Sequence, residues 1–183
     1  MSADDRVVIR GERVVLRAFR PEEFDAWYAS RTASAGDPTL SPGGPPDPDH
    51  LRERTERSGV LRDGWLDLAI EVDGRLAGEI GVYGETPEER RPPGNFFFGI
   101  GLFDPADRGR GLGTEATRLL SDWLFREAGA VRIETATAVT NAAMRRVFER
   151  LGWRPDGTEV RWDVEWARYV LDRDTRERSA STG

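Results

Sequence analysis

The sequence predicts a single α/β domain in which helices cover both faces of one mixed β-sheet. Three observations predict this fold. Strand-like and helix-like patterns alternate along almost the whole chain, an apolar run leads through a glycine-rich corner into an amphipathic helix, and no internal repeat is found. A chain of 183 residues can bury roughly two-thirds of its unfolded surface. We expect the domain to occupy residues 1–172, followed by a polar tail over residues 173–183.

The composition excludes several classes of protein. A net charge of −6 argues against a general nucleic-acid binder, because neutralising phosphates requires a basic surface. The absence of cysteine excludes disulfides and zinc–sulfur sites, and the absence of lysine excludes a Schiff-base lysine. No apolar run approaches the length of a membrane span. We therefore expect a cytoplasmic protein with no metal and with no nucleic-acid or membrane partner.

The first third of the chain predicts one strand and two helices. Residues 7–17 alternate around a Gly11-Glu12 turn and predict the first strand. Pro21 and the carboxylates after it begin a helix that runs to about Ser30. The segment 34–49 is rich in Pro, Gly and Asp and long for a connection, so we expect either a functional lid or a mobile loop. Residues 50–61 predict a short second helix.

The middle of the chain predicts a hairpin, a buried strand and a long helix. The alternating runs 65–72 and 75–83 flank an Asp-Gly pair, which is typical of a β-hairpin, and an exposed loop over 84–94 follows. The apolar run 96–103 predicts a buried strand. Apolar residues at three- and four-residue spacing then predict an amphipathic helix that ends at Gly129.

The last third predicts a strand, a capped helix and a final strand. Residues 131–139 alternate, and Asn141 is expected to cap a short helix closed by Gly152. A turn at residues 156–157 is expected to lead into a last strand over residues 159–171, with Trp162 and Trp166 on one face. An edge strand of this kind can bury its tryptophans against a second copy, so a homodimer is one expectation.

Three alternating glycines, Gly109, Gly111 and Gly113, lie at the corner between the buried strand and the central helix. The backbone can turn tightly there and present N–H groups at the positive end of the helix, which favours a bound phosphate. The spacing and the absence of lysine exclude a Walker A loop, and a position after four strands argues against a dinucleotide-binding fold. The alternative is a turn that only lets helix and strand pack closely.

These residues carry a resemblance to a known family. Arg108-x-x-Gly111-x-Gly113 resembles the acetyl-CoA motif of the GNAT N-acetyltransferase superfamily. A second block, from Asn141 to Trp153, is similar to the Asn-to-Gly-Phe segment of its ribosomal-protein N-terminal and polyamine acetyltransferase branch, and the opening stretch 12–17 is similar to the first strand of that branch. The resemblance covers nearly the whole chain.

The resemblance implies a sheet that is splayed open between the strands 96–103 and 131–139, with acetyl-CoA as co-substrate in the opening. The pyrophosphate would lie on the N–H groups of the glycine corner, and the pantetheine arm would hydrogen-bond to the free strand backbone. A backbone N–H near Phe103 would polarise the thioester. The cofactor-binding residues implied are Leu102, Phe103, Arg108, Gly109, Arg110, Gly111, Leu112, Gly113, Thr114, Asn141 and Phe148.

The implied reaction needs a base, because a protonated amine with a pKa near ~10.4 is not a nucleophile. Glu79 and Glu134 are the candidate catalytic bases, with His50 and Tyr83 as further candidates. The acid for the departing thiolate is unassigned, because Phe148 stands where the superfamily has a tyrosine and Met144 where some members have a serine.

The leading hypothesis is therefore an acetyl-CoA-dependent N-acetyltransferase that acts by direct attack of a primary amine, from a small molecule or a protein N-terminus. An acyl-CoA-binding or sensing module with weak or lost turnover is the alternative that Phe148 and Met144 support. A structural protein whose glycine corner only packs is a third. The sequence names no acceptor.

Overall fold

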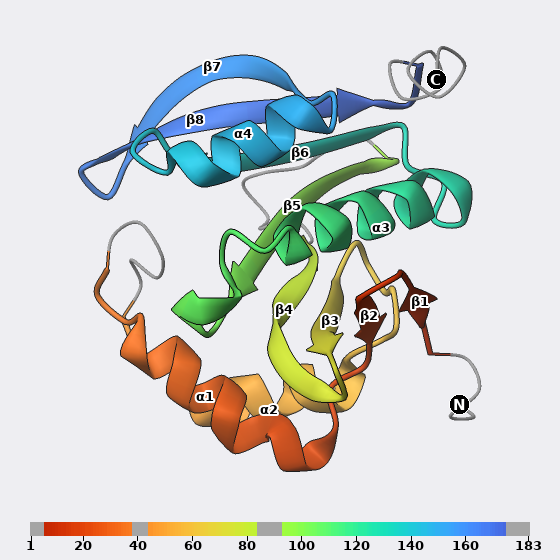
Figure 1. Ribbon diagram of the computed structural model, residues 1–183, viewed down its shortest axis with the longest axis vertical. Helices are drawn as coiled ribbons and strands as arrows, with labels where there is room; N and C mark the ends of the chain where they lie inside the picture. Colours follow the sequence, from red (N-terminus) through yellow and green to blue (C-terminus); the bar gives the residue numbers. More distant parts are fainter. Residues whose placement is uncertain (1–5, 38–43, 84–92, 175–183) are drawn as a thin grey trace.

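The computed structural model describes residues 6–37, 44–83 and 93–174, and these form one open eight-stranded sheet with helices on both faces (Figure 1). The strands lie in the order β1-β2-β3-β4-β5-β6-β8-β7. Their bounds are β1 Ile9–Arg10, β2 Val14–Arg17, β3 Leu66–Val72, β4 Arg75–Tyr83, β5 Asn95–Leu102, β6 Arg132–Ala138, β7 Arg154–Arg161 and β8 Val164–Asp172. The helices are α1 Phe24–Ala33, α2 Pro48–Arg57, α3 Leu112–Arg126 and α4 Ala142–Arg150. The predicted α/β fold class is confirmed.

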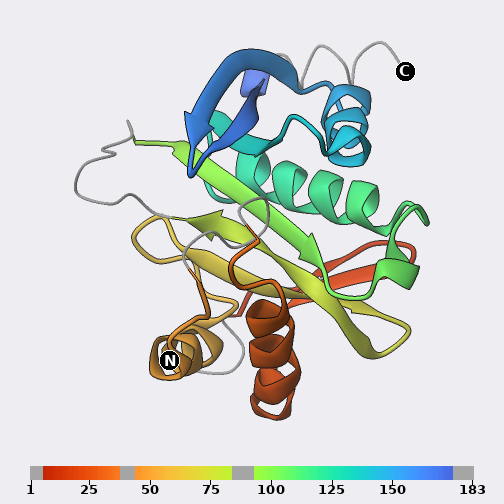
Figure 2. The same ribbon diagram turned by 90° about the vertical axis from the view of Figure 1, so that its left-hand side faces the viewer.

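The helices divide between the two faces of the sheet, with α1 and α2 on one side and α3 on the other (Figure 2). The main core lies between the sheet and α3 and α4, where Leu120 and Phe98 are almost fully buried. A smaller core holds α1 and α2 against the other face, and the stacked rings of Phe19 and Trp27, 4.0 Å apart, lie in it.

The strands β5 and β6 are parallel and are paired over only three residue pairs, Asn95↔Arg132, Phe96↔Ile133 and Phe97↔Glu134. The last pair is followed by a side-chain hydrogen bond, in which the Thr135 hydroxyl donates to the Phe98 carbonyl over 2.9 Å. Beyond this point β5 continues to Leu102 and β6 to Ala138 without pairing to each other. The sheet is therefore open between these strands, as the resemblance implied.

The end of the chain differs from the sequence prediction. The expected single strand over residues 159–171 is two antiparallel strands, β7 and β8, and the turn between them is at Trp162-Asp163. Both turn residues have positive φ, as a two-residue hairpin of this hand requires. The expected turn at residues 156–157 is instead an irregularity inside β7, where the register shifts between Pro155 and Thr158. Trp162 therefore lies in a turn and not in a strand, but its ring still contacts that of Trp166 edge to face, with the ring centroids 6.2 Å apart.

Smaller differences concern the ends of elements. The second helix begins at Pro48, two residues earlier than expected, because Asp47 caps it by accepting a hydrogen bond from the N–H of Asp49. The first strand is a short hairpin, β1 and β2. Most of the expected polar tail lies outside the described residues, but its first residue is anchored, because Arg173 donates to the Ala130 carbonyl over 2.9 Å. Parts of the two expected loops, 38–43 and 84–92, also lie outside the described residues. Among the described residues, no helix combines the length and apolar character that crossing a membrane requires.

The point where β5 and β6 separate, at the Phe97↔Glu134 pair and the Thr135 hydrogen bond, is called the apex of the opening. It gives a test of the fold. Thr135→Val removes the hydroxyl and leaves the buried Phe98 carbonyl without its donor, so we expect a loss of about 1–3 kcal/mol in the free energy of unfolding. The matched control is Thr137→Val on the same strand, because Thr137 is also buried and no hydrogen bond of its side chain is described. Urea unfolding measures both variants, and equal losses would contradict a role for the apex bond.

Candidate functional site

The glycine corner ends at the N-terminus of α3, and that helix end has no side-chain cap. Gly111 is the N-cap residue with φ of +82°, and Gly109 has φ of +73°, so both adopt a left-handed conformation that favours glycine. A Cβ on Gly109 would have no atom within 4 Å, so the space beside this loop is open. An uncapped helix start leaves its first N–H groups without intrahelical partners. This corner can bind an anion such as a phosphate.

Buried Asp107 fixes the loop before these glycines. Its carboxylate accepts two hydrogen bonds from Arg75, at 2.6 and 2.8 Å, and one from Arg110 at 3.0 Å. The hydrogen bonds and positive charge of the arginines hold the pKa of Asp107 below its ordinary value, with Arg75 as the main cause. Asp107 thus orients the Arg110 guanidinium, whereas Arg108 is exposed.

The turn between β1 and β2 also holds the glycine corner and the start of α3 in place. Glu115, in the first turn of α3, accepts hydrogen bonds from the backbone N–H groups of Arg13 and Val14, at 2.9 and 3.3 Å. Burial opposes ionisation of Glu115, but these donors outweigh it and lower its pKa. The Arg13 guanidinium also donates to the Arg110 carbonyl over 2.7 Å. A Cβ on Gly11 would lie 2.3 Å from the Glu115 carboxylate, so a larger residue there would displace this side chain from its hydrogen bonds.

The opening between β5 and β6 extends from the glycine corner to the apex. Ile100 and Leu102 on β5 each lie 4.0 Å from the position of a Cβ on Gly113. The Phe103 N–H donates to the Ala77 carbonyl over 3.0 Å. Because antiparallel strands alternate in the direction of their N–H and C=O groups, the backbone groups of Ile100 and Leu102 point away from β4 and into the opening. This edge can accept an extended ligand as an added strand.

The alternating direction of the backbone groups along β5 bears on the N–H that was expected near Phe103 to polarise a thioester. The N–H of Phe103 is already paired, so it is not available to polarise a thioester. Leu102 keeps the position that was expected for it beside the opening. Leu112 is a buried first residue of α3, and the partly buried Gly113 and Thr114 follow it in the first turn.

Asn141 and Phe148, which were expected to bind the cofactor, both make contacts within the protein. The Asn141 side-chain oxygen accepts a hydrogen bond from the Met144 N–H over 3.1 Å, so the predicted helix cap is confirmed. Phe148 is 1% exposed, and its ring packs at 5.2 Å from Trp153 and 5.3 Å from Tyr169. A contact between Phe148 and a cofactor stays a prediction.

Glu79 lies on β4 opposite Gly101, on the face that α1 covers. Its two carboxylate oxygens accept hydrogen bonds from Trp27 Nε1 at 2.7 Å and from Arg31 at 3.0 Å. Tyr83 lies four residues further along β4 with its ring over Gly99, where a Cβ would lie 2.6 Å from the ring. Burial and the nearby Glu79 raise the pKa of Tyr83, which keeps its hydroxyl neutral and makes it a poor base. The third candidate, His50, is exposed on α2.

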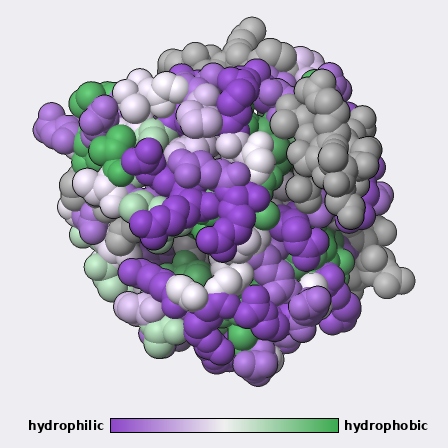
Figure 3. All heavy atoms as spheres, turned by 45° about the horizontal axis from the view of Figure 1, so that its top comes forward, coloured by the Kyte–Doolittle hydropathy of each residue, from purple (hydrophilic) through white to green (hydrophobic). Residues whose placement is uncertain are grey.

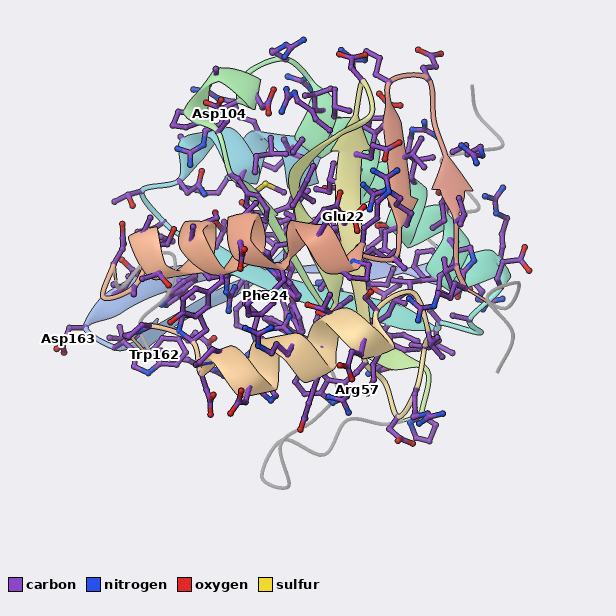
Figure 4. All side chains as sticks on the ribbon, turned by 90° about the horizontal axis from the view of Figure 1, so that it is seen from below. Glu22, Phe24, Arg57, Asp104, Trp162 and Asp163 are labelled. Atoms are coloured by element: carbon purple, nitrogen blue, oxygen red, sulfur yellow. The ribbon has the colours of Figure 1, made fainter. Side chains whose placement is uncertain are left out.

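Glu134 lies at the apex, opposite Phe97 in the last β5–β6 pair. It lines a pocket of about 120 Å³ together with residues from four strands; the lining is Phe97, Glu134, Thr135, Ala136, Glu159, Arg161 and Arg168. Figure 4 shows the helices α1 and α2 lying beside each other across the sheet, with Trp162 and Asp163 at the tip of the β7–β8 hairpin. The structure therefore places Glu134 in a pocket and Glu79 under a helix, so the two candidate bases are not in one site.

A helix start that can bind an anion, beside a sheet edge that is open to an extended ligand, is the arrangement expected of an acetyltransferase that binds acyl-coenzyme A. The model of the acetyltransferase (GNAT) domain family matches residues 13–154 of this chain. The chain therefore belongs to the GNAT acetyltransferase family, whose co-substrate is acetyl-CoA. The family that the glycine corner and the second block indicated is confirmed.

Individual relatives are similar over parts of the chain. The probable N-acetyltransferase YjcK of Bacillus subtilis is 41% identical over 59 residues, 32% of this chain and 33% of that protein, so the match spans about a third of its length. The kanamycin resistance protein of Rhizobium radiobacter is 30% identical over 94 residues, 51% of this chain and 87% of that protein. The crystal structure of aminoglycoside acetyltransferase AAC(6')-Ib with coenzyme A and kanamycin has a TM-score of 0.74 at 22% identity, covering 91% and 99% of the two chains.

Several residues that shape the site were not found from the sequence. Each of these residues acts through a partner that lies far away along the chain. Arg13 pairs with Glu115, Arg75 pairs with Asp107, and Thr135 donates to the Phe98 carbonyl. Arg13 lies in the opening stretch that carried the family resemblance, but no local pattern indicates its contact with the loop.

Asp107 gives a pH-dependent test of the loop. Because its pKa is lowered in the folded state, it contributes stability that is fully present above its unfolded pKa, about 3.9, and is lost as the pH falls through the lower folded value. Asp107→Asn should therefore lower the urea midpoint at pH 7, and the difference from the wild type should shrink below about pH 4.

The matched control for this test is Asp104→Asn, because Asp104 is an exposed neighbour whose side chain caps the turn at the Ala106 N–H, and asparagine keeps that acceptor. We expect little change for this variant at any pH. A pH-independent difference for Asp107→Asn would contradict the assigned ion pairs.

Proposed function

We propose that this protein transfers the acetyl group of acetyl-CoA to a primary amine by direct attack of the amine. The observation that carries the proposal is the open edge of β5, which begins beside an uncapped glycine-rich helix start. Together they provide a phosphate site at one end of a strand edge with unpaired backbone groups. Membership of the GNAT family supports the same activity.

In this proposal the residues of the corner hold the cofactor. The pyrophosphate accepts hydrogen bonds from the N–H groups of Gly109 to Thr114, and Arg108 and Arg110 supply positive charge. The pantetheine arm pairs with the backbone of Ile100 and Leu102, because these are the groups that face the opening. The side-chain oxygen of Asn141 is used by the helix cap, so its amide nitrogen is the group left to contact the arm.

The chemistry needs loss of a proton from the ammonium group before attack. Glu134 is the proposed base, acting through water, because it lines the pocket at the apex. Glu79 has hydrogen bonds to both carboxylate oxygens and serves to hold α1 on the sheet. A backbone N–H of β5 that faces the opening polarises the thioester carbonyl. No side chain is assigned as the thiolate acid, and a thiol with a pKa near ~8.5 can leave without one.

Two acceptor classes follow from the relatives. The kanamycin resistance protein and the kanamycin complex of AAC(6')-Ib make an aminoglycoside amine one candidate acceptor. Other primary amines, including a protein N-terminus, are the second. The alternative function, an acyl-CoA-binding module with weak turnover, is favoured by the buried Phe148, which has no proton to give to the thiolate.

The test is release of free CoA from acetyl-CoA in the presence of kanamycin, a diamine, a panel of amino acids and a set of peptides, with the acetylated product identified by mass spectrometry. Turnover with at least one amine is the expected result. Tight acetyl-CoA binding with no turnover would support the binding module instead, and absence of binding would leave the glycine corner with a packing role only.

The variant Gly109→Glu tests where the cofactor lies. It adds a carboxylate to the glycine corner in open space, where its charge repels a bound pyrophosphate, so calorimetry should show acetyl-CoA binding weakened more than tenfold. Gly129→Glu is the matched control, because Gly129 follows the other end of α3 with a similar φ of +71° and open space around it. Similar affinities for the two variants would place the cofactor elsewhere.

A further inference from the structure

Among the described residues, carboxylates on the face of the sheet that carries α1 and α2 are paired with arginine side chains in both halves of the sheet. On β3 and β4, Asp67 pairs with Arg54 at 2.5 Å and Glu79 pairs with Arg31 at 3.0 Å. The strands beyond the opening repeat this arrangement, with the pairs Glu134–Arg132 at 3.1 Å, Glu159–Arg161 at 3.1 Å, Asp156–Arg168 at 3.4 Å and Asp172–Arg154 at 3.4 Å.

The strand register places the pocket on this same face. Phe97 lies opposite both Tyr83 and Glu134, and Ala136 lies opposite Arg168. Directly opposed residues of paired strands share a face. The pocket walls contain two carboxylates and two guanidinium groups on an apolar floor, so their charges balance.

The surface of the molecule is also hydrophilic. The side of the molecule in Figure 3, with the top of Figure 1 brought forward, is dominated by hydrophilic residues and has only scattered hydrophobic ones. The arginine side chains of three of these ion pairs, Arg154, Arg161 and Arg168, are each at least 40% exposed.

This balance is unfavourable for a polycation. Each additional ammonium group of such a ligand needs a carboxylate, and the two carboxylates that line the pocket, Glu134 and Glu159, already have arginine partners. An ammonium group that displaced a guanidinium from its partner would leave two positive charges close together, and these repel each other. A ligand that brings its own negative charge avoids this cost, because guanidinium groups bind carboxylates through parallel hydrogen bonds.

Arginine side chains at the pocket retain surface for such a contact. Arg161 and Arg168 are 47% and 40% exposed while they keep their ion pairs. On the other half of the sheet, Arg31 pairs with Glu79 of β4, and its Nε is buried without a hydrogen-bond partner among the described residues. All three arginines lie on the face of the sheet on which the pocket lies.

We propose that the acceptor is a small amine that also carries a carboxylate, of the α-amino acid type, and that Arg161 and Arg168 bind its carboxylate. This rests on the proposed acetyl transfer. The amine nitrogen forms a bond to the acetyl carbon, the carbon–sulfur bond breaks, and the amine proton passes through water to Glu134 and solvent. The sulfur leaves as thiolate and takes a proton from water, giving an N-acetyl amino acid and free CoA.

The experiment compares each amino acid with its own amide, which keeps the side chain and amine but lacks the carboxylate. Release of CoA is measured with both sets and with spermidine as a polycation. We expect kcat/KM for the best amino acid to exceed that of its amide at least tenfold, and spermidine to be a poorer acceptor than either.

Two variants then assign the carboxylate contact. Arg161→Gln and Arg168→Gln should each reduce the ratio of acid to amide kcat/KM at least fivefold, mainly through KM for the acid. Arg146→Gln is the matched control, because Arg146 is an exposed arginine on α4 away from the pocket. A variant that only disturbs the fold would lower activity toward acid and amide alike and leave the ratio unchanged.

The outcomes separate the two proposals. If spermidine or the amides are better acceptors than the acids, the acceptor class is wrong while acetyl transfer stands. If the acids are preferred but the Arg161 and Arg168 variants keep the wild-type ratio, the carboxylate contact assigned to these arginines is wrong. If no amine in any set releases CoA, acetyl transfer itself is wrong.

Discussion

The structure depends on the short contact between β5 and β6. Three residue pairs and the hydrogen bond from Thr135 to the Phe98 carbonyl join two halves of the sheet, and beyond them the strands separate. Unpaired backbone at a sheet edge is normally a liability, because it is a template for pairing with another chain. Here the unpaired edge lies inside the sheet beside α3, where a pantetheine arm can satisfy it. The opening therefore leaves backbone groups of the sheet unpaired, and it is also the proposed binding site for acetyl-CoA.

Arginine maintains this arrangement, and the chain has no lysine with which to do so. A guanidinium group can bind two partners at fixed angles, and several arginines here use that property. Arg13 joins Glu115 to the carbonyl of Arg110, and Arg75 holds Asp107 before the glycines. These contacts fix a loop whose glycines alone would leave it free. On the face that carries α1 and α2, arginines pair with carboxylates in both halves of the sheet, so the charges of these pairs balance.

The local features of the sequence predicted the fold well. The Asp73-Gly74 turn, the glycine corner and the Asn141 cap depend on neighbouring residues and are found as expected. Features that depend on tertiary contacts were not predicted. The pair Trp162-Asp163 has no glycine to indicate a two-residue hairpin, so the sequence predicted one strand over residues 159–171, and the turn expected at residues 156–157 is an irregularity within β7. Similarly, the pairing of the Phe103 N–H follows from strand register, which no single segment reveals.

The central claim is that acetyl-CoA binds as an added strand between β5 and β6. Amide hydrogen exchange, resolved by residue and measured with and without acetyl-CoA, tests it directly. We expect binding to slow exchange at Ile100 and Leu102 and at the N–H groups from Gly109 to Thr114, while Phe103, whose N–H is already paired, changes little. Protection confined to other parts of the chain, with Ile100 and Leu102 unchanged, would contradict the claim.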